Sequence, residues 1–283
     1  MHSIVVTSNS RIDGAIAKEQ SVSRSFAKIL LDQGKVKLND KVVYKASTKV
    51  NEGDHIILDF ILTDLKDIPN IKLDIIYQDN DCLVVYKPEG VLTHSKGKFN
   101  PEATVSTFIR PFTEGMEDNR GGIVHRLDRV TSGLLICAKN EPALKWLQEQ
   151  FATRKAQKTY VALVEGVPSN AEAVIDMPIE RNPKKPQTFR VGPNGKPATT
   201  RYKVLVANQK YSLLELKPTT GRTHQLRVHL AQLGHPIVGD QLYGAQPADR
   251  VFLHAKSLQL ILPNKKLMTF ECDLPKIFND LTN

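Results

Sequence analysis

The chain has 283 residues, of which 41% are hydrophobic, so it can bury a full core and a disordered chain is not expected. Its formal charge is +9 and its pI is about 9.3, which favours a polyanionic partner, although basic composition alone is not specific. No stretch approaches the roughly 18 apolar residues of a membrane span, and the apolar run at the N-terminus is too short for a signal peptide. We therefore expect a soluble, cytoplasmic protein with no membrane association.

The three cysteines are far apart in the sequence and contain no CxxC pair. Cys82 and Cys137 lie inside apolar runs, so we expect buried free thiols. The cysteines therefore indicate neither a zinc site nor a disulfide framework.

Residues 1–62 are predicted to form a small α+β unit. Ser23 can cap a helix whose apolar residues recur at helical spacing, and Gly34 follows the end of that helix. Two short strands at 35–38 and 41–43 follow, with a turn at Asn39 and Asp40, and the run at residues 56–58 predicts a third. Seven basic residues face two acidic ones between residues 24 and 49, a pattern that on charge alone fits a solvated face or a phosphate contact.

Residues 63–71 are predicted to be a linker, and residues 72–283 the second and larger domain. The larger domain opens with a predicted hairpin, whose strands at 75–77 and 83–86 flank a polar turn. The second strand stops at Lys-Pro-Glu-Gly, which is a turn signal.

The most informative stretch is a loop that opens with Gly121 and Gly122 and runs into an apolar strand at 133–138. Within it Asp128 lies between Arg126 and Arg129, whose positive charge favours an ionised carboxylate that can act as a nucleophile or base. An isolated carboxylate in this setting more often caps a turn or pairs on the surface, so the pattern needs further support.

Asn140 is predicted to cap the next helix, which should lie across the sheet. The strand at 157–166 then places Lys158 and Tyr160 on the same face. A tyrosine on a strand is as often a core residue with its hydroxyl at the rim as it is a binding residue.

The segment from residue 181 to residue 210 has eight basic residues and no acidic one. Four prolines and the Asn194-Gly195 pair predict a loop or hairpin arm there. A basic hairpin that protrudes favours contact with the phosphates of a polyanionic partner.

A second polar block runs from residue 217 to residue 230, where a helix is predicted to begin near residues 221–223. Arg222 would then lie at a helix N-terminus, where it could hold a carboxylate or a phosphate, although a plain surface arginine is the alternative. His224 and His229 are five residues apart and diverge on a helix, so we expect no metal site.

The string His125–Leu134 resembles the H-R-L-D-x-x-T-S-G-L signature of the RluA family of pseudouridine synthases. Three further blocks, at 86–90, 158–166 and 221–229, are similar to the family's other motifs and follow in the expected order. Residues 1–62 also resemble the small RNA-binding module first described in ribosomal protein S-four.

The resemblance implies an α+β protein with a pseudouridine synthase fold, in which a mainly antiparallel mixed sheet carries a central catalytic cleft. It also implies that uridine within RNA is isomerised to pseudouridine without a cofactor. On this resemblance Asp128 is the catalytic aspartate, Arg222 pairs with it, and Tyr160 stacks on the flipped base and is a candidate for removing the proton at carbon 5. Arg126 would fill the gap that the uridine leaves in the RNA stack.

RNA is the expected partner, with ribosomal RNA of the large subunit favoured and transfer RNA possible, and we expect a monomer. A non-catalytic RNA-binding factor for ribosome assembly on the same fold is the alternative. The residues expected to contact RNA are Arg126, Arg129, His125, Lys158, Arg24, Lys28, Lys37, Arg190 and Lys196.

Overall fold

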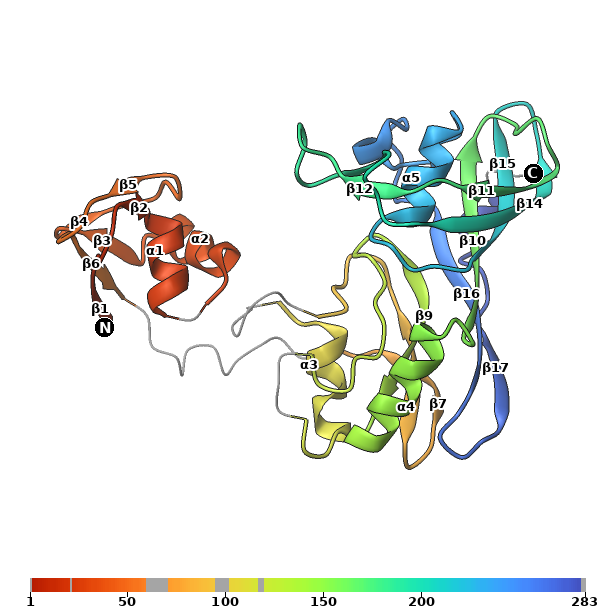
Figure 1. Ribbon diagram of the computed structural model, residues 1–283, viewed down its shortest axis with the longest axis horizontal. Coiled ribbons are helices and arrows are strands. Elements are labelled where there is room, and N and C mark those ends of the chain that lie inside the picture. The colour runs from red at the N-terminus through yellow and green to blue at the C-terminus, as the bar shows by residue number, and fades with distance from the viewer. Residues whose placement is uncertain (1, 21, 60–70, 95–101, 117–119, 281–283) are drawn as a thin grey trace. The chain divides into compact units, whose positions relative to one another are not determined.

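The computed structural model describes residues 2–20, 22–59, 71–94, 102–116 and 120–280 (Figure 1). The predicted linker at 63–71 lies almost wholly outside these residues. The chain divides into two compact units. The first comprises described residues within 1–72, 94–108 and 117–120, and the second comprises those within 73–93, 109–116 and 121–283.

The N-terminal part of the first unit packs two helices on a four-stranded sheet of order β1-β6-β3-β4. Ser23 caps α2 as predicted, because its hydroxyl accepts a hydrogen bond from Phe26 N at 3.1 Å. The predicted helix and the three predicted strands are confirmed, whereas α1 and β1 were not predicted. The elements are β1 (His2–Val5), β2 (Ser10–Arg11), α1 (Ile12–Glu19), α2 (Arg24–Asp32), β3 (Val36–Leu38), β4 (Lys41–Val42), β5 (Lys49–Val50) and β6 (His55–Leu58).

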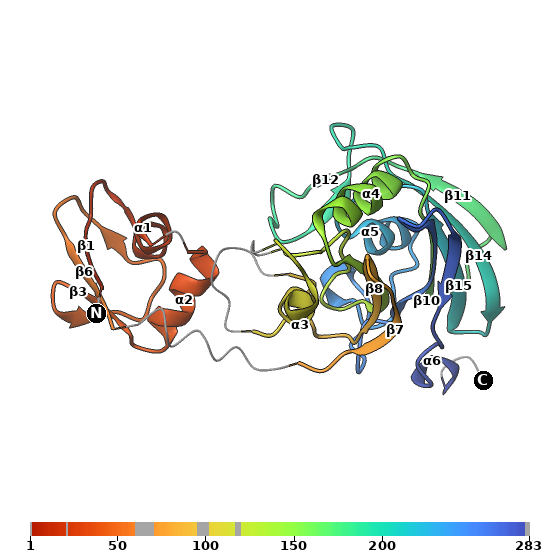
Figure 2. The same ribbon diagram turned by 90° about the horizontal axis from the view of Figure 1, so that it is seen from below.

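The second unit is built on a long, curved sheet of order β11-β14-β15-β10-β16-β9-β8-β7, with β17 paired to β16 (Figures 1 and 2). Every pairing in it is antiparallel except that of β16 with β9. Its strands are β7 (Asp74–Gln78), β8 (Cys82–Lys87), β9 (Ser132–Ala138), β10 (Gln157–Glu165), β11 (Glu172–Asp176), β14 (Thr199–Ala207), β15 (Tyr211–Pro218), β16 (Leu253–Ile261) and β17 (Leu267–Glu271). The remaining elements of this unit in chain order are η2 (Arg110–Phe112), α4 (Glu141–Ala152), the hairpin of β12 (Ile179–Arg181) and β13 (Phe189–Val191), α5 (Gln225–Gln232), η3 (Gln241–Tyr243) and α6 (Ile277–Asp280). The helix α3 (Val105–Ile109) has all but its last residue in the first unit.

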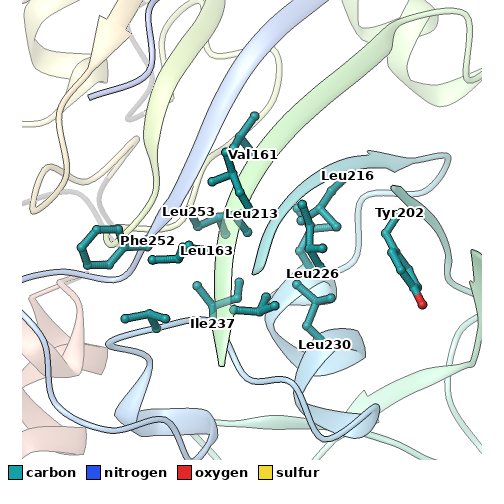
Figure 3. Packing of buried hydrophobic residues seen from close by; sticks show 14 of the residues in the cluster. Val161, Leu163, Tyr202, Leu213, Leu216, Leu226, Leu230, Ile237, Phe252 and Leu253 are labelled. Atoms are coloured by element: carbon teal, nitrogen blue, oxygen red, sulfur yellow. The ribbon is translucent and has the colours of Figure 1, made fainter. Parts of the chain in front are cut away.

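Two helices bury the apolar side chains of this sheet. Leu226 and Leu230 of α5 pack with strand residues such as Leu163 and Leu216 in one cluster (Figure 3). Ala143 and Leu147 of α4 pack on β8, β9 and β16 in another, as the capped helix was predicted to do. Burial of this apolar surface holds α5 against the strands that carry the site.

Most predicted elements of the second unit are confirmed, including the hairpin of β7 and β8 and the strands β9 and β10. The prediction of a loop or hairpin arm over 181–210 is correct for β12 and β13 but wrong for β14, which is a nine-residue strand inside the sheet. Its buried Thr200 and Tyr202 alternate with exposed Arg201 and Lys203, so the basic residues there are the outer face of a strand. Among the described residues, no helix has the length and apolar character needed to cross a membrane.

Candidate active site

Asp128 lies in the loop that leads into β9. Hydrogen bonds to the backbone of this loop hold it in place. The hydroxyl of Thr93 donates to Leu127 O at 2.8 Å and accepts from Leu127 N at 3.1 Å. Thr131 N donates to Asp128 O at 3.0 Å. The Asp128 side chain is 18% exposed and lines an open pocket, so a group of a bound substrate can reach it.

A buried cation lies close to Asp128: Arg227 on α5, whose Nη1 is 3.7 Å from Asp128 Oδ2. The same guanidinium donates from Nε and Nη2 to the two carboxylate oxygens of buried Asp240, at 2.6 and 2.7 Å. Burial acts to lower the pKa of Arg227, but the hydrogen bonds and charge of Asp240 outweigh it and raise that pKa above its usual range. Arg227 is therefore a fixed positive charge directed at Asp128.

The resemblance implied that Arg222 pairs with Asp128. In the structure Asp128 instead lies beside Arg227. Arg222 lies before the helix, because α5 begins at Gln225, and its Nε donates to Pro197 O at 3.1 Å. The side-chain oxygen of Gln225 accepts a hydrogen bond from Arg222 N at 3.0 Å, which holds the residues before the helix in a loop. Arg222 still lines the pocket, where it can meet a substrate.

His224 is a second residue of the site that the sequence analysis did not assign. Its Nε2 lies 3.9 Å from Asp128 Oδ2, and its Nδ1 is 2.7 Å from the Tyr243 hydroxyl. Its φ of 56° is in the left-handed region, which is strained for a residue with a Cβ. Burial lowers the pKa of His224, so the ring is neutral near pH 7.

Tyr160 and Lys158 line the same pocket from β10, as their shared strand face predicts. Burial, followed by the charge of Asp128, raises the pKa of Tyr160, so its phenol stays protonated near neutral pH. A neutral tyrosine presents an aromatic face for stacking. Its hydroxyl can act as a base only after it has passed its own proton to another group.

Comparison with known proteins identifies this arrangement. Residues 81–232 match the family model described as RNA pseudouridylate synthase, and residues 10–56 match the S4 domain model. The chain is 37% identical to ribosomal large subunit pseudouridine synthase D of Yersinia pestis, over 96% of this chain and 90% of that protein. The chain belongs to the RNA pseudouridylate synthase family. This confirms the predicted resemblance, and the protein is an isomerase that converts uridine in RNA to pseudouridine.

Two further comparisons agree. An RNA pseudouridine synthase of Aquifex aeolicus is 37% identical over 96% of this chain and 92% of its own length. Among solved structures, human RNA pseudouridylate synthase domain containing 1 superposes with a TM-score of 0.61 at 31% identity, over 72% of this chain and 85% of that one. The predicted fold of a pseudouridine synthase with an N-terminal S4 module is therefore confirmed.

The cations predicted to bind RNA have different surroundings in this pseudouridylate synthase. Arg126 is exposed at the edge of the Asp128 pocket, and Lys158 lines it. Arg129 does not line this pocket, and its Nη1 donates to Gly90 O at 3.1 Å. His125 is mainly a packing residue: its ring stacks on Phe151 and its Nε2 accepts from the Ile136 backbone at 3.2 Å.

The other predicted RNA contacts lie outside the Asp128 pocket. Three of them pair with a carboxylate: Arg24 with Asp13, Lys28 with Asp32, and Arg190 with Glu180. Lys37 and Lys196 are exposed. Contact of these side chains with RNA stays a prediction. Within the described part of the chain, no group of three or more His, Cys, Asp or Glu residues is placed to hold a metal.

Lys87 holds the backbone next to Asp128 in place through hydrogen bonds, a role that the sequence analysis did not assign. It is fully buried at the end of β8, and its Nζ donates to Pro88 O and Val91 O at 2.9 Å and to Arg129 O at 3.3 Å. Burial lowers the pKa of Lys87 to about 7, while the charge of Asp128 acts in the opposite direction. The three carbonyl oxygens match the three N–H groups of an ammonium, and the bond to Arg129 O holds the backbone next to Asp128 in place.

Lys87→Met is expected to lower the free energy of unfolding by about 2–4 kcal/mol, because a side chain of similar length leaves three carbonyls without their donor. Urea unfolding followed by circular dichroism measures the change. Lys155→Met, at an exposed lysine, is the control and should change the value by less than about 0.5 kcal/mol. Equal stabilities for the two variants would show that Lys87 does not hold the loop.

Proposed function

We propose that this pseudouridine synthase modifies uridines of large-subunit ribosomal RNA, with Asp128 as the catalytic carboxylate. The observation that carries the assignment of Asp128 is its position beside Arg227 in an open pocket that basic side chains line. The target is supported by the curated relatives named ribosomal large subunit pseudouridine synthase D, which the chain matches over nearly its whole length. The S4 module adds basic surface that would raise affinity for RNA.

The pocket suits a uridine that has left its helix, because a paired base cannot reach a recessed carboxylate. Tyr160 would stack on the uracil, and Arg126 would enter the space that the base vacates. Arg227 would hold a positive charge beside the Asp128 carboxylate while the glycosidic bond breaks and reforms at carbon 5 of uracil. Arg222 would contact the RNA at the pocket wall and would not orient Asp128.

Basic groups outside the pocket would set affinity and not chemistry. The exposed Lys37 of the N-terminal unit and Lys196 after the β12–β13 hairpin would contact phosphates. We further propose that the protein acts as a monomer in the cytoplasm and that residues 1–62 and 72–283 are its two domains, joined by a linker.

Mapping pseudouridines by carbodiimide-blocked reverse transcription, in cells with and without the gene, tests the target. We expect one or more stops in large-subunit ribosomal RNA to vanish without the gene and to return when the wild-type gene is restored. Stops that vanish only in transfer RNA would overturn the proposed target while leaving the reaction in place. A Lys155→Met gene should restore the stops as well as wild type.

A further inference from the structure

A second pocket adjoins that of Asp128 on the side of helix α4. The two pockets share Arg126, Lys158 and Tyr160, so one bound strand can occupy both. The second pocket continues past these residues to the end of α4, where Phe151 and Arg154 line it. None of the chemistry proposed above uses this extension.

Lys158 lies between the two pockets and carries a charge that no described carboxylate compensates. Its Nζ has one hydrogen bond to a described residue, at 3.3 Å to Thr220 O, and no described carboxylate within 4 Å. Burial lowers its pKa to about 8, with no acidic group acting against the shift. A cation in such a site is costly unless an anion completes it, so the pocket is suited to a negatively charged ligand.

Arg154 occupies a backbone position that usually belongs to glycine. It follows Thr153, the C-cap of α4, with a φ of 62°. A side chain there is strained, and the exposed guanidinium makes no hydrogen bond or ion pair with any residue that the structure describes. Local folding therefore gives no reason for an arginine at this position.

An aromatic wall lies beside these two cations. The Phe151 ring is partly exposed and stacks on His125, with ring centroids 4.4 Å apart and planes inclined by 19°. The stack fixes the orientation of the Phe151 ring. A fixed aromatic ring beside unpaired cations suits a nucleotide, since the base stacks while the cations hold its phosphate.

We propose that this second pocket binds the nucleotide next to the target uridine, with its base against Phe151 and its phosphate between Arg154 and Lys158. This inference rests on the proposed function, because the target base must occupy the pocket of Asp128. It predicts that one particular phosphate of the RNA, adjacent to the target, is read by these two side chains.

The test pairs protein variants with an RNA that lacks one charge. The probe is a synthetic hairpin RNA built around the mapped uridine, with a methylphosphonate at one linkage at a time. Arg154→Gly is expected to raise KM and Kd about tenfold with little change in kcat, and to keep or raise the melting temperature because glycine favours positive φ. Lys145→Gln is the control on the same helix, where the lysine pairs with Glu141 and lines neither pocket.

An uncharged linkage beside the target should weaken wild-type binding about tenfold but should weaken Arg154→Gly or Lys158→Gln by clearly less, because each variant has already lost one of the two contacts to that phosphate. The proposal is overturned if Arg154→Gly binds as wild type does, if the two effects multiply, or if the sensitive linkage lies elsewhere in the hairpin. Tritium release by the wild type from the unmodified hairpin is followed in parallel, so that a failure of the proposed reaction is seen separately.

Discussion

Asp128→Asn is expected to lower kcat for the release of tritium from RNA labelled at carbon 5 of uridine at least about 10³-fold. The amide has nearly the shape of the carboxylate but lacks the negative charge that a nucleophile or base requires. The fold should survive, because Arg227 keeps its buried partner Asp240. RNA affinity should stay close to that of the wild type, since the surrounding cations are unchanged.

Asp74→Asn provides the matched control, since this carboxylate is exposed on the edge strand β7. Its tritium release should equal that of the wild type, and melting temperatures of both variants should confirm that they are folded. Release by Asp128→Asn at the control's rate would show that the carboxylate does not act in the reaction. Absence of release from all three proteins, with RNA binding intact, would favour a non-catalytic RNA-binding factor.

The sequence was sufficient to single out Asp128 as the candidate carboxylate because the residues around it form one continuous string. Its loop, the strand β9 after it and the strand that carries Tyr160 depend on local patterns, namely turn glycines and apolar runs. These patterns predicted the elements of the site correctly. What they could not supply was the distance between two strings nearly a hundred residues apart.

The choice of the wrong arginine shows this limit. The block at 221–229 contains both Arg222 and Arg227, and the resemblance, together with a helix start expected near residues 221–223, favoured Arg222, whereas the helix begins at Gln225. The helix begins later because His224 adopts a left-handed conformation and Gln225 turns its side chain back to accept hydrogen bonds from Thr220 and Arg222. Such a start depends on contacts within the folded loop, and propensity alone does not indicate it.

The strand β14 was missed for a different reason. Prolines and basic residues across the surrounding segment favoured a loop, although Thr200 and Tyr202 alternate with charged neighbours as on a half-buried strand. The average composition of the segment therefore outweighed a period-two signal that was present. Lys87 could not have been assigned either, because a lysine is buried only where folding brings carbonyl oxygens around it.

Arg227→Lys is expected to lower kcat about 10²-fold or more with little change in RNA affinity, whereas Arg222→Lys should lower it less than about tenfold. A lysine at 227 keeps the charge but cannot hold both oxygens of Asp240 and still direct an N–H at Asp128. At position 222 a lysine keeps the charge at the pocket wall, where no bond to Asp128 exists to be lost.

Single-turnover tritium release and filter binding separate the two effects, and melting temperatures guard against misfolding. Arg227→Gln is the wrong variant for this purpose, because it leaves Asp240, 1% exposed, without a counter-ion and should cost about 3–5 kcal/mol of stability. A larger loss of kcat in Arg222→Lys than in Arg227→Lys would mean that RNA binding moves Arg222 onto Asp128 and that the pairing in the free protein is not the catalytic one. A larger loss of kcat in Arg227→Lys would show that Arg227 forms the ion pair with Asp128 in the reacting complex. Asp240 already holds the guanidinium of Arg227 in place in the free protein.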